Sequence, residues 1–171
     1  MSTRIAISLE VNGASVEALV EPRLTLADFL RKDLKLTGTH LGCEHGICGA
    51  CTILLDGAAA RACLLFASQL DGHRVTTVEG ISGAAELSTL QQCFRKHHAL
   101  QCGFCTPGLL ITAHALLQEH PAPSREQIED TISGNLCRCT GYIPIVDAIA
   151  DAARIGAGAP AGTAAAVEGP P

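Results

Sequence analysis

The sequence is poor in aromatic residues and in positive charge, and it has no long apolar run. Among 171 residues, aromatics make up 3%, tryptophan is absent, and the formal net charge is −5. So few large aromatic side chains give a light hydrophobic core, which favours extra stabilisation by bound metal. An acidic chain lacks the basic surface that binds nucleic acids and anionic membranes. No apolar segment approaches the roughly 20 residues that cross a bilayer.

The N-terminus lacks the apolar stretch and cleavage site of a signal peptide, and it has no twin-arginine pair. Residues 1–13 are instead typical of a strand followed by a turn. We therefore expect a cytoplasmic protein, in which clustered cysteines more often bind metal than form disulfides. The nine cysteines are also an odd number, so they cannot all pair with one another.

Alternating apolar and polar residues, two hairpin turns and one capped helix predict a small α+β domain over residues 1–80. The expected strands cover residues 4–11, 15–20, 52–55 and 75–78, with turns at Asn12-Gly13 and Asp56-Gly57. A partner strand after the second turn is expected to end near Cys63 and to carry it. Thr25 is expected to cap a helix over residues 25–34, with Asp28 three residues after the cap. Residues 38–49 are a glycine-rich loop.

Helical periodicity dominates after Gly80 and predicts a four-helix-bundle domain over residues 81–155. Helices are expected over residues 88–99, from Pro107 to His120, from the Ser124 cap to Gly134, and over residues 143–155. We expect a metal site in the loops between these helices. Residues 156–171 are rich in glycine, alanine and proline and are predicted to form a flexible tail.

Eight of the nine cysteines fall into two sets of four. The first set is Cys43, Cys48, Cys51 and Cys63, spaced C-x4-C-x2-C-x11-C. Plant-type ferredoxins hold a [2Fe–2S] cluster with the C-x4-C-x2-C spacing and a later fourth cysteine. Glycines in this loop let the chain bend so that successive sulfurs point inward. A structural zinc site is the alternative, although zinc ribbons usually show paired C-x2-C knuckles.

The second set is Cys102, Cys105, Cys137 and Cys139, in which C-x2-C is followed by C-x-C after 31 intervening residues. By spacing alone this set suits zinc nearly as well as iron. A second redox centre would explain why the first one is present, so we expect a [2Fe–2S] cluster here too. The cysteines adjoin expected helix ends, and the positive end of a helix stabilises an anionic thiolate cluster.

The other chemistry-bearing residues are not assigned to metal sites. Cys93 lies on an expected helix beside Leu90 and Phe94 and is interpreted as a small buried hydrophobe. The seven histidines are not needed as ligands, because each set already has four cysteines. There is no glycine loop for dinucleotides or phosphates and no Ser-His-Asp arrangement. We expect no catalytic residue in this chain, which would move electrons for another protein.

Three segments resemble the iron–sulfur subunit of molybdenum hydroxylases, the group of xanthine dehydrogenase, aldehyde oxidoreductase and aerobic carbon-monoxide dehydrogenase. They are residues 42–52, 99–108 and 134–142, and the likeness covers roughly residues 3–155. The resemblance implies a ferredoxin-like β-grasp domain followed by a four-helix domain, each with a [2Fe–2S] cluster. It also implies a separate subunit rather than part of a fused enzyme.

The same resemblance implies partners and a direction of electron flow. Substrate would be hydroxylated at a molybdopterin centre in a large partner subunit. Electrons would pass to a cluster on the second cysteine set, then to one on the first set, and then to FAD in a medium subunit. Gln101 resembles the glutamine that hydrogen-bonds the molybdopterin, and Cys139 would lie nearest the pterin. An ordinary polar residue before a loop is the alternative for Gln101.

Two other functions remain open at this point. A free-standing ferredoxin would shuttle electrons by diffusion, but a cluster among helices better suits docking to a large partner. A zinc-stapled interaction module would have no redox activity. We expect an electron-transfer subunit of a heteromeric molybdenum hydroxylase, whose substrate these residues do not specify.

Overall fold

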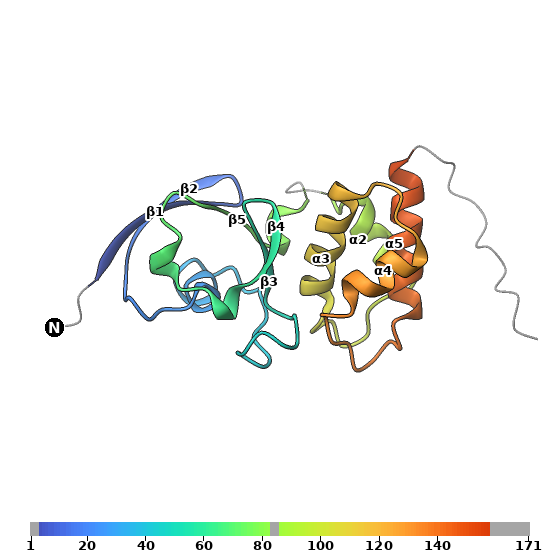
Figure 1. The fold of residues 1–171 in the computed structure, drawn as a ribbon, viewed down its shortest axis with the longest axis horizontal. Coiled ribbons are helices and arrows are strands. Elements are labelled where there is room, and N and C mark those ends of the chain that lie inside the picture. Colours follow the sequence, from blue (N-terminus) through green and yellow to red (C-terminus); the bar gives the residue numbers. More distant parts are fainter. Residues whose placement is uncertain (1–3, 83–85, 158–171) are drawn as a thin grey trace, which may run out of the picture.

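The computed structural model describes residues 4–82 and 86–157, in which a sheet-containing half precedes a helical half. The two halves lie side by side along the longest axis of the molecule (Figure 1). Two clusters of buried apolar side chains form their cores, one beside the sheet and one between the helices. The expected order of strands first and helices second is confirmed. Most of the predicted tail, from residue 158 onward, lies outside the described residues.

The first half contains a mixed sheet. Its strands are β1 (Ile5–Val11), β2 (Ala14–Val20), β3 (Thr52–Leu55), β4 (Ala58–Arg61) and β5 (Arg74–Thr76), in the spatial order β2-β1-β5-β3-β4. β1 and β5 are parallel, and the other neighbouring strands are antiparallel. The predicted turns at Asn12-Gly13 and Asp56-Gly57 close the two hairpins with all four residues at positive φ. Such turns match the right-handed twist of paired strands.

The helix expected over residues 25–34 is split into two pieces. α1 (Leu26–Asp28) is followed by a π-helical segment, Phe29–Asp33. The predicted cap is confirmed, because the Thr25 hydroxyl accepts a hydrogen bond from the Asp28 N–H at 3.1 Å. The Leu34 N–H then bonds to the Phe29 carbonyl, five residues earlier, at 3.1 Å, which widens the last turn.

The last strand is shorter than predicted. It was expected over residues 75–78 but ends at Thr76. The next N–H, that of Thr77, donates to the Asn12 side-chain oxygen at 2.8 Å instead of to a strand. A 3₁₀ turn, Val78–Gly80, follows and carries the chain toward the helices.

The helical half is built from α2 (Thr89–Lys96), α3 (Thr106–Glu119), α4 (Arg125–Ile132) and α5 (Ile143–Gly156). Ser88 and Ser124 each cap a helix in a capping box with a glutamine three residues later. α2 ends earlier than the predicted Ala99, and His98 beyond it has a left-handed φ of 51°. α3 packs against both α4 and β3, so it joins the helical core to the sheet.

A buried carboxylate ties α5 to α2. Asp151 on α5 is only 7% exposed and accepts hydrogen bonds from Lys96 Nζ at 2.7 Å and from His97 Nε2 at 2.9 Å. Arg154 on the same helix donates to the other carboxylate oxygen. The Lys96 ammonium first, and then the His97 ring, hold the pKa of Asp151 well below its usual range.

We expect Asp151→Asn to lower the free energy of unfolding at pH 7 by about 1–3 kcal/mol, because charged hydrogen bonds are lost. The folded pKa lies below the unfolded value of about 3.9, so the ionised carboxylate stabilises the fold above roughly pH 4. That contribution disappears as the pH falls further, so the free energies of unfolding of the variant and the parent should converge. Urea unfolding at pH 7 and at lower pH measures this.

Asp147→Asn is the matched control on the same helix, since Asp147 makes an exposed ion pair with Arg125. Exposed pairs contribute at most about 1 kcal/mol. Equal losses in the two variants would contradict the role assigned to Asp151.

Candidate metal centres

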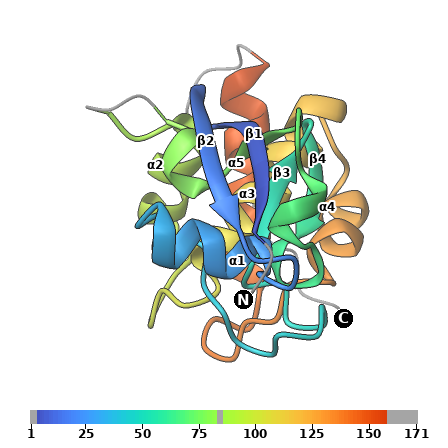
Figure 2. The same cartoon turned by 90° about the vertical axis from the view of Figure 1, so that its left-hand side faces the viewer.

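The cysteine-bearing loops gather on one side of the molecule. They are the segments 38–51, 97–105 and 133–142, which lie outside the helices and strands. In Figure 1 the loop before β3 and the loop before α5 both project downward, and Figure 2 shows the same arrangement after a turn of 90°. Residues far apart in the sequence thus meet on this side of the fold.

The first set of cysteines forms two pairs. The Cys48 N–H donates to the Cys43 sulfur at 3.3 Å, and the side chains of these two residues interact. The side chains of Cys51 and Cys63 interact in the same way. Cys63 lies in a 3₁₀ turn, Ala62–Leu64, directly after β4, rather than on the strand as predicted. The Ala62 N–H donates to the Cys51 carbonyl at 3.2 Å, which fixes this turn beside Cys51.

The second set also forms two pairs. The sulfurs of Cys102 and Cys139 are 3.6 Å apart, and the side chains of Cys105 and Cys137 interact. Cys105 is buried at the N-terminus of α3, whereas Cys102 is exposed. The Thr140 hydroxyl lies 3.1 Å from the Cys137 sulfur.

Sulfurs that meet in pairs suit a binuclear cluster, because each of two iron atoms takes two cysteine ligands. Within the part of the chain that the structure describes, no three His, Cys, Asp or Glu side chains are placed to hold a single metal ion. The donor chemistry and the pairing therefore fit a [2Fe–2S] cluster at each site.

The thiols differ in how readily they ionise. Backbone N–H groups, first that of Cys48 and then that of His45, lower the pKa of the Cys43 thiol to about 6. Burial raises the pKa of Cys51 to about 11 and that of Cys105 to about 12. Metal binding must displace the protons of the two buried thiols, because the thiolate is the ligand.

The backbone of the first loop bends as its glycines predict. Gly46 and Gly49 have φ values of 86° and 72°, in the left-handed region that favours glycine. Glu44, also in this loop, has a φ of 58°. His45 is a loop residue whose ring Nδ1 lies 2.5 Å from the Cys43 carbonyl oxygen.

Tyr142 holds the second loop and was not identified from the sequence. Its hydroxyl accepts a hydrogen bond from the Cys137 N–H at 2.8 Å and donates one to the Asn135 carbonyl at 3.2 Å. Tyr142 itself has a φ of 69° at the start of α5. Its place inside the 134–142 segment was the available signal, but nothing in the sequence showed that the ring folds back onto the loop.

Three further residues, Gln101, His40 and Cys93, take different places. Gln101 is exposed, and its Nε2 donates to the Cys139 carbonyl at 3.0 Å. His40 stacks on Phe104 with ring centroids 5.0 Å apart, and its Nδ1 lies 2.8 Å from the Phe104 carbonyl oxygen. Cys93 is buried in the helical core, as predicted.

Comparison with known proteins agrees with this geometry. Residues 9–80 match the family described as "2Fe-2S iron-sulfur cluster binding domain", and residues 77–150 match the "[2Fe-2S] binding domain". The small subunit of nicotine 6-hydroxylase from Paenarthrobacter nicotinovorans is 58% identical over 151 residues, which cover 88% of this chain and 91% of that one. Subunit gamma of caffeine dehydrogenase from Pseudomonas sp. (strain CBB1) is 54% identical over 152 residues, covering 87% and 90%.

A solved structure has the same fold. It is quinoline 2-oxidoreductase from Pseudomonas putida 86, with a TM-score of 0.88, 53% identity, and coverage of 91% of this chain and 98% of that chain. This chain belongs to the small iron–sulfur subunits of the molybdenum hydroxylases. The resemblance found in the sequence is confirmed, and so is the presence of two [2Fe–2S]-binding parts in this iron–sulfur subunit.

Over the described ranges 4–82 and 86–157 of the iron–sulfur subunit, no helix has the length and apolar character needed to cross a bilayer.

We expect Tyr142→Phe to lower the free energy of unfolding by about 1 kcal/mol, because the Cys137 N–H loses its acceptor. The loop around Cys137 should exchange its amide hydrogens faster, as measured by mass spectrometry on a peptide covering residues 134–140. Thr131→Val is the control, since the Thr131 hydroxyl makes one hydrogen bond on α4, to the Gln127 carbonyl. Faster loop exchange in the control as well would contradict a specific role for Tyr142.

Proposed function

We propose that this subunit carries electrons from a molybdopterin centre in a large partner subunit, through two [2Fe–2S] clusters, toward FAD in a medium subunit or another acceptor. The observation that supports this most is that two four-cysteine sites, each arranged as two pairs, lie on the same side of the fold with their loops in contact (Figure 1). Each site falls within a region that matches a [2Fe–2S]-binding family.

We assign the ligands by these pairs. Cys43 and Cys48 would hold one iron of the first cluster, with Cys51 and Cys63 on the other. Cys102 and Cys139 would hold one iron of the second cluster, with Cys105 and Cys137 on the other. When bound, each cluster supplies a one-electron redox centre. The Thr140 hydroxyl is placed to donate to the Cys137 thiolate, an interaction of the kind that tunes cluster potentials.

The same proposal covers the domain organisation. Residues 1–80 would form a plant-type ferredoxin-like β-grasp domain, and residues 81–155 a four-helix-bundle domain. The separate cores of the two halves support this division. We also propose a cytoplasmic location, where thiols stay reduced and clustered cysteines more often bind metal than form disulfides.

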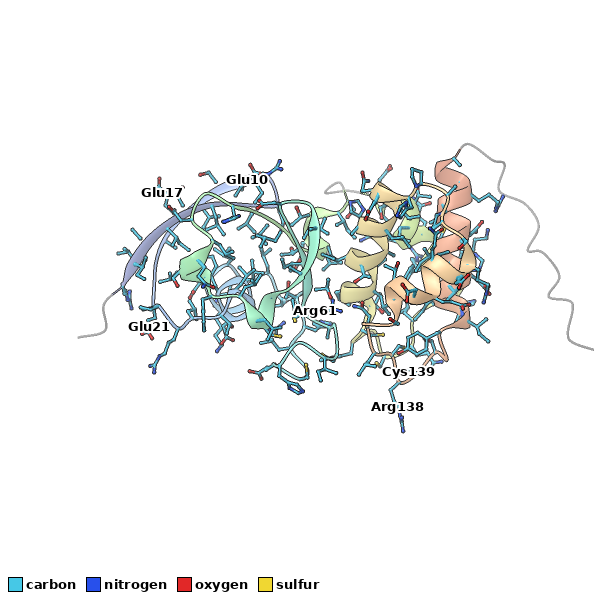
Figure 3. The ribbon with its side chains drawn as sticks, viewed as in Figure 1. Glu10, Glu17, Glu21, Arg61, Arg138 and Cys139 are labelled. Carbon is cyan, nitrogen blue, oxygen red and sulfur yellow. The ribbon has the colours of Figure 1, made fainter. Side chains whose placement is uncertain are left out.

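Gln101 and Cys139 are proposed to face the molybdopterin of the partner. Cys102 and Gln101 are exposed, so the edge of the second site is open to an approaching subunit. The Gln101 amide already donates to the Cys139 carbonyl, which would hold its side chain beside this edge. In Figure 3, Arg138, the residue before Cys139, points outward from the loop 133–142.

A free-standing ferredoxin is the less favoured function. Large apolar side chains are exposed beside both sites: Ile47 and Leu64 near the first, and Leu100, Leu136 and Ile143 near the second. Apolar residues gathered around a redox site favour docking to a protein partner. Fixed-ratio co-purification of a molybdenum subunit would support the proposal, whereas a monomer active with ferredoxin reductases would contradict it.

The assignment is tested by iron analysis and EPR of the anaerobically purified protein. We expect about four irons per chain and two distinguishable reduced signals. Cys105→Ser should leave about two irons and abolish only the signal of the second site. Cys93→Ser is the matched control, because Cys93 belongs to neither site, and it should keep both signals. Equal loss of both signals in Cys105→Ser, or zinc in place of iron, would contradict the assignment.

The role of Gln101 is tested in the assembled holoenzyme. We expect Gln101→Ala to leave the iron content intact and to slow cluster reduction by substrate, because the proposed hydrogen bond to the molybdopterin would be lost. Stopped-flow absorbance measures this rate. Gln92→Ala is the control, since Gln92 is an exposed glutamine on α2. Unchanged reduction in Gln101→Ala would reject the proposed contact.

A further inference from the structure

One backbone hydrogen bond connects the two cysteine sites directly. The Leu136 N–H donates to the Cys48 carbonyl at 2.9 Å. Cys48 belongs to the first site, and Leu136 directly precedes Cys137 of the second site in the sequence. The two cysteine loops are therefore in contact through residues that belong to, or adjoin, the sites themselves.

A buried asparagine lies beside this contact. Asn135 is 1% exposed, and its Nδ2 donates to the Gly49 carbonyl at 3.0 Å and toward the Thr52 hydroxyl at 3.3 Å. Its Oδ1 accepts from the Thr112 hydroxyl on α3 at 3.0 Å, which fixes the orientation of the amide. Its backbone carbonyl accepts from Tyr142. One side chain thus joins the first cysteine loop, β3 and α3.

Two glycines permit this close approach. A Cβ on Gly49 would meet the Gly134 carbonyl at 2.5 Å and Asn135 Nδ2 at 2.7 Å. A Cβ on Gly108 would meet the Gly49 carbonyl at 2.3 Å. A side chain at either position would require the neighbouring backbone to shift.

An arginine crosses the same junction. Arg61 at the end of β4 donates to the Gly134 carbonyl at 2.7 Å and to the Thr52 hydroxyl. Figure 3 shows Arg61 between the two halves of the molecule. Thr52 is therefore contacted by Arg61 from its own half and by Asn135 from the helical half, while Arg61 also reaches Gly134 across the junction. The junction contains a connected polar network rather than a single bond.

We infer that Asn135 is a positioning residue that fixes the contact between the two cysteine sites and so sets their separation. The inference rests on the proposed function, because it concerns the spacing of two redox sites. The side chain supplies donors to the first loop, while the adjacent Leu136 N–H makes the direct bond to Cys48. A polar network that is buried and fully hydrogen-bonded holds one geometry, since any shift leaves a group unpaired. The eight cysteines by themselves do not impose that separation of the two sites.

The test uses the full chain loaded with both clusters. Asn135→Asp replaces the Nδ2 donor with an oxygen that faces the Gly49 carbonyl, at almost unchanged volume. We expect Leu136 to exchange its amide hydrogen about tenfold faster, the loss expected for one hydrogen bond. We also expect a weaker spin–spin interaction between the two reduced clusters in EPR, with four irons retained.

Asn12→Asp is the matched control. Asn12 also joins two segments through its side chain, donating to Thr77 Oγ1 and accepting from the Thr77 N–H, but it lies in the β1–β2 turn. Neither the Leu136 exchange nor the spin–spin interaction should change in this variant.

Thr112→Val provides a milder second variant if Asn135→Asp does not fold. It removes the hydroxyl that orients the Asn135 amide and should change both measurements in the same direction by a smaller amount. Unchanged exchange and unchanged spin–spin interaction in a folded, iron-loaded variant would overturn the inference and leave the proposed function standing. A parent protein that binds no iron would instead overturn the proposed function.

Discussion

The relative position of the two halves depends on a buried polar junction, in which the Asn135 amide reaches Gly49, Thr52 and Thr112. The two apolar cores are separate clusters, and the halves meet where α3 packs against β3. Buried amide groups are costly when unpaired and directional when paired. The junction therefore acts together with the α3–β3 packing to hold one arrangement of the halves, and the cysteine loops come to lie on one side of the molecule (Figure 1).

The two sites are assembled by tertiary contacts in different ways. The first is mostly local: three of its cysteines lie in one loop, and the β3–β4 hairpin returns the fourth. The second brings together segments that lie on either side of α3 and α4 in the sequence. Its later loop has no regular structure, and the Tyr142 hydroxyl supplies the missing support by bonding to the Cys137 N–H and the Asn135 carbonyl. A single tyrosine thus holds a loop that carries two of the cysteines.

Much of the local structure could be predicted, because short-range rules decide it. The Thr25 and Ser124 caps, the Asn12-Gly13 turn and the Pro107 helix start depend on residues within four positions of one another. One error occurred where a distant residue intervened. The last strand stops at Thr76 because Asn12, far away in the sequence, takes the next N–H.

The sequence by itself determined the elements and their order, the two cysteine sets and the family, because spacing, periodicity and motif are properties of nearby residues. The tertiary structure decided which sulfurs pair, where Cys63 and Gln101 lie, and how the two sites touch. Arg61 and Asn135 showed no sign of their role in the sequence, since a lone arginine and a lone asparagine have no characteristic spacing. Their importance comes from hydrogen bonds between residues more than seventy positions apart, which exist only once both halves have folded and met.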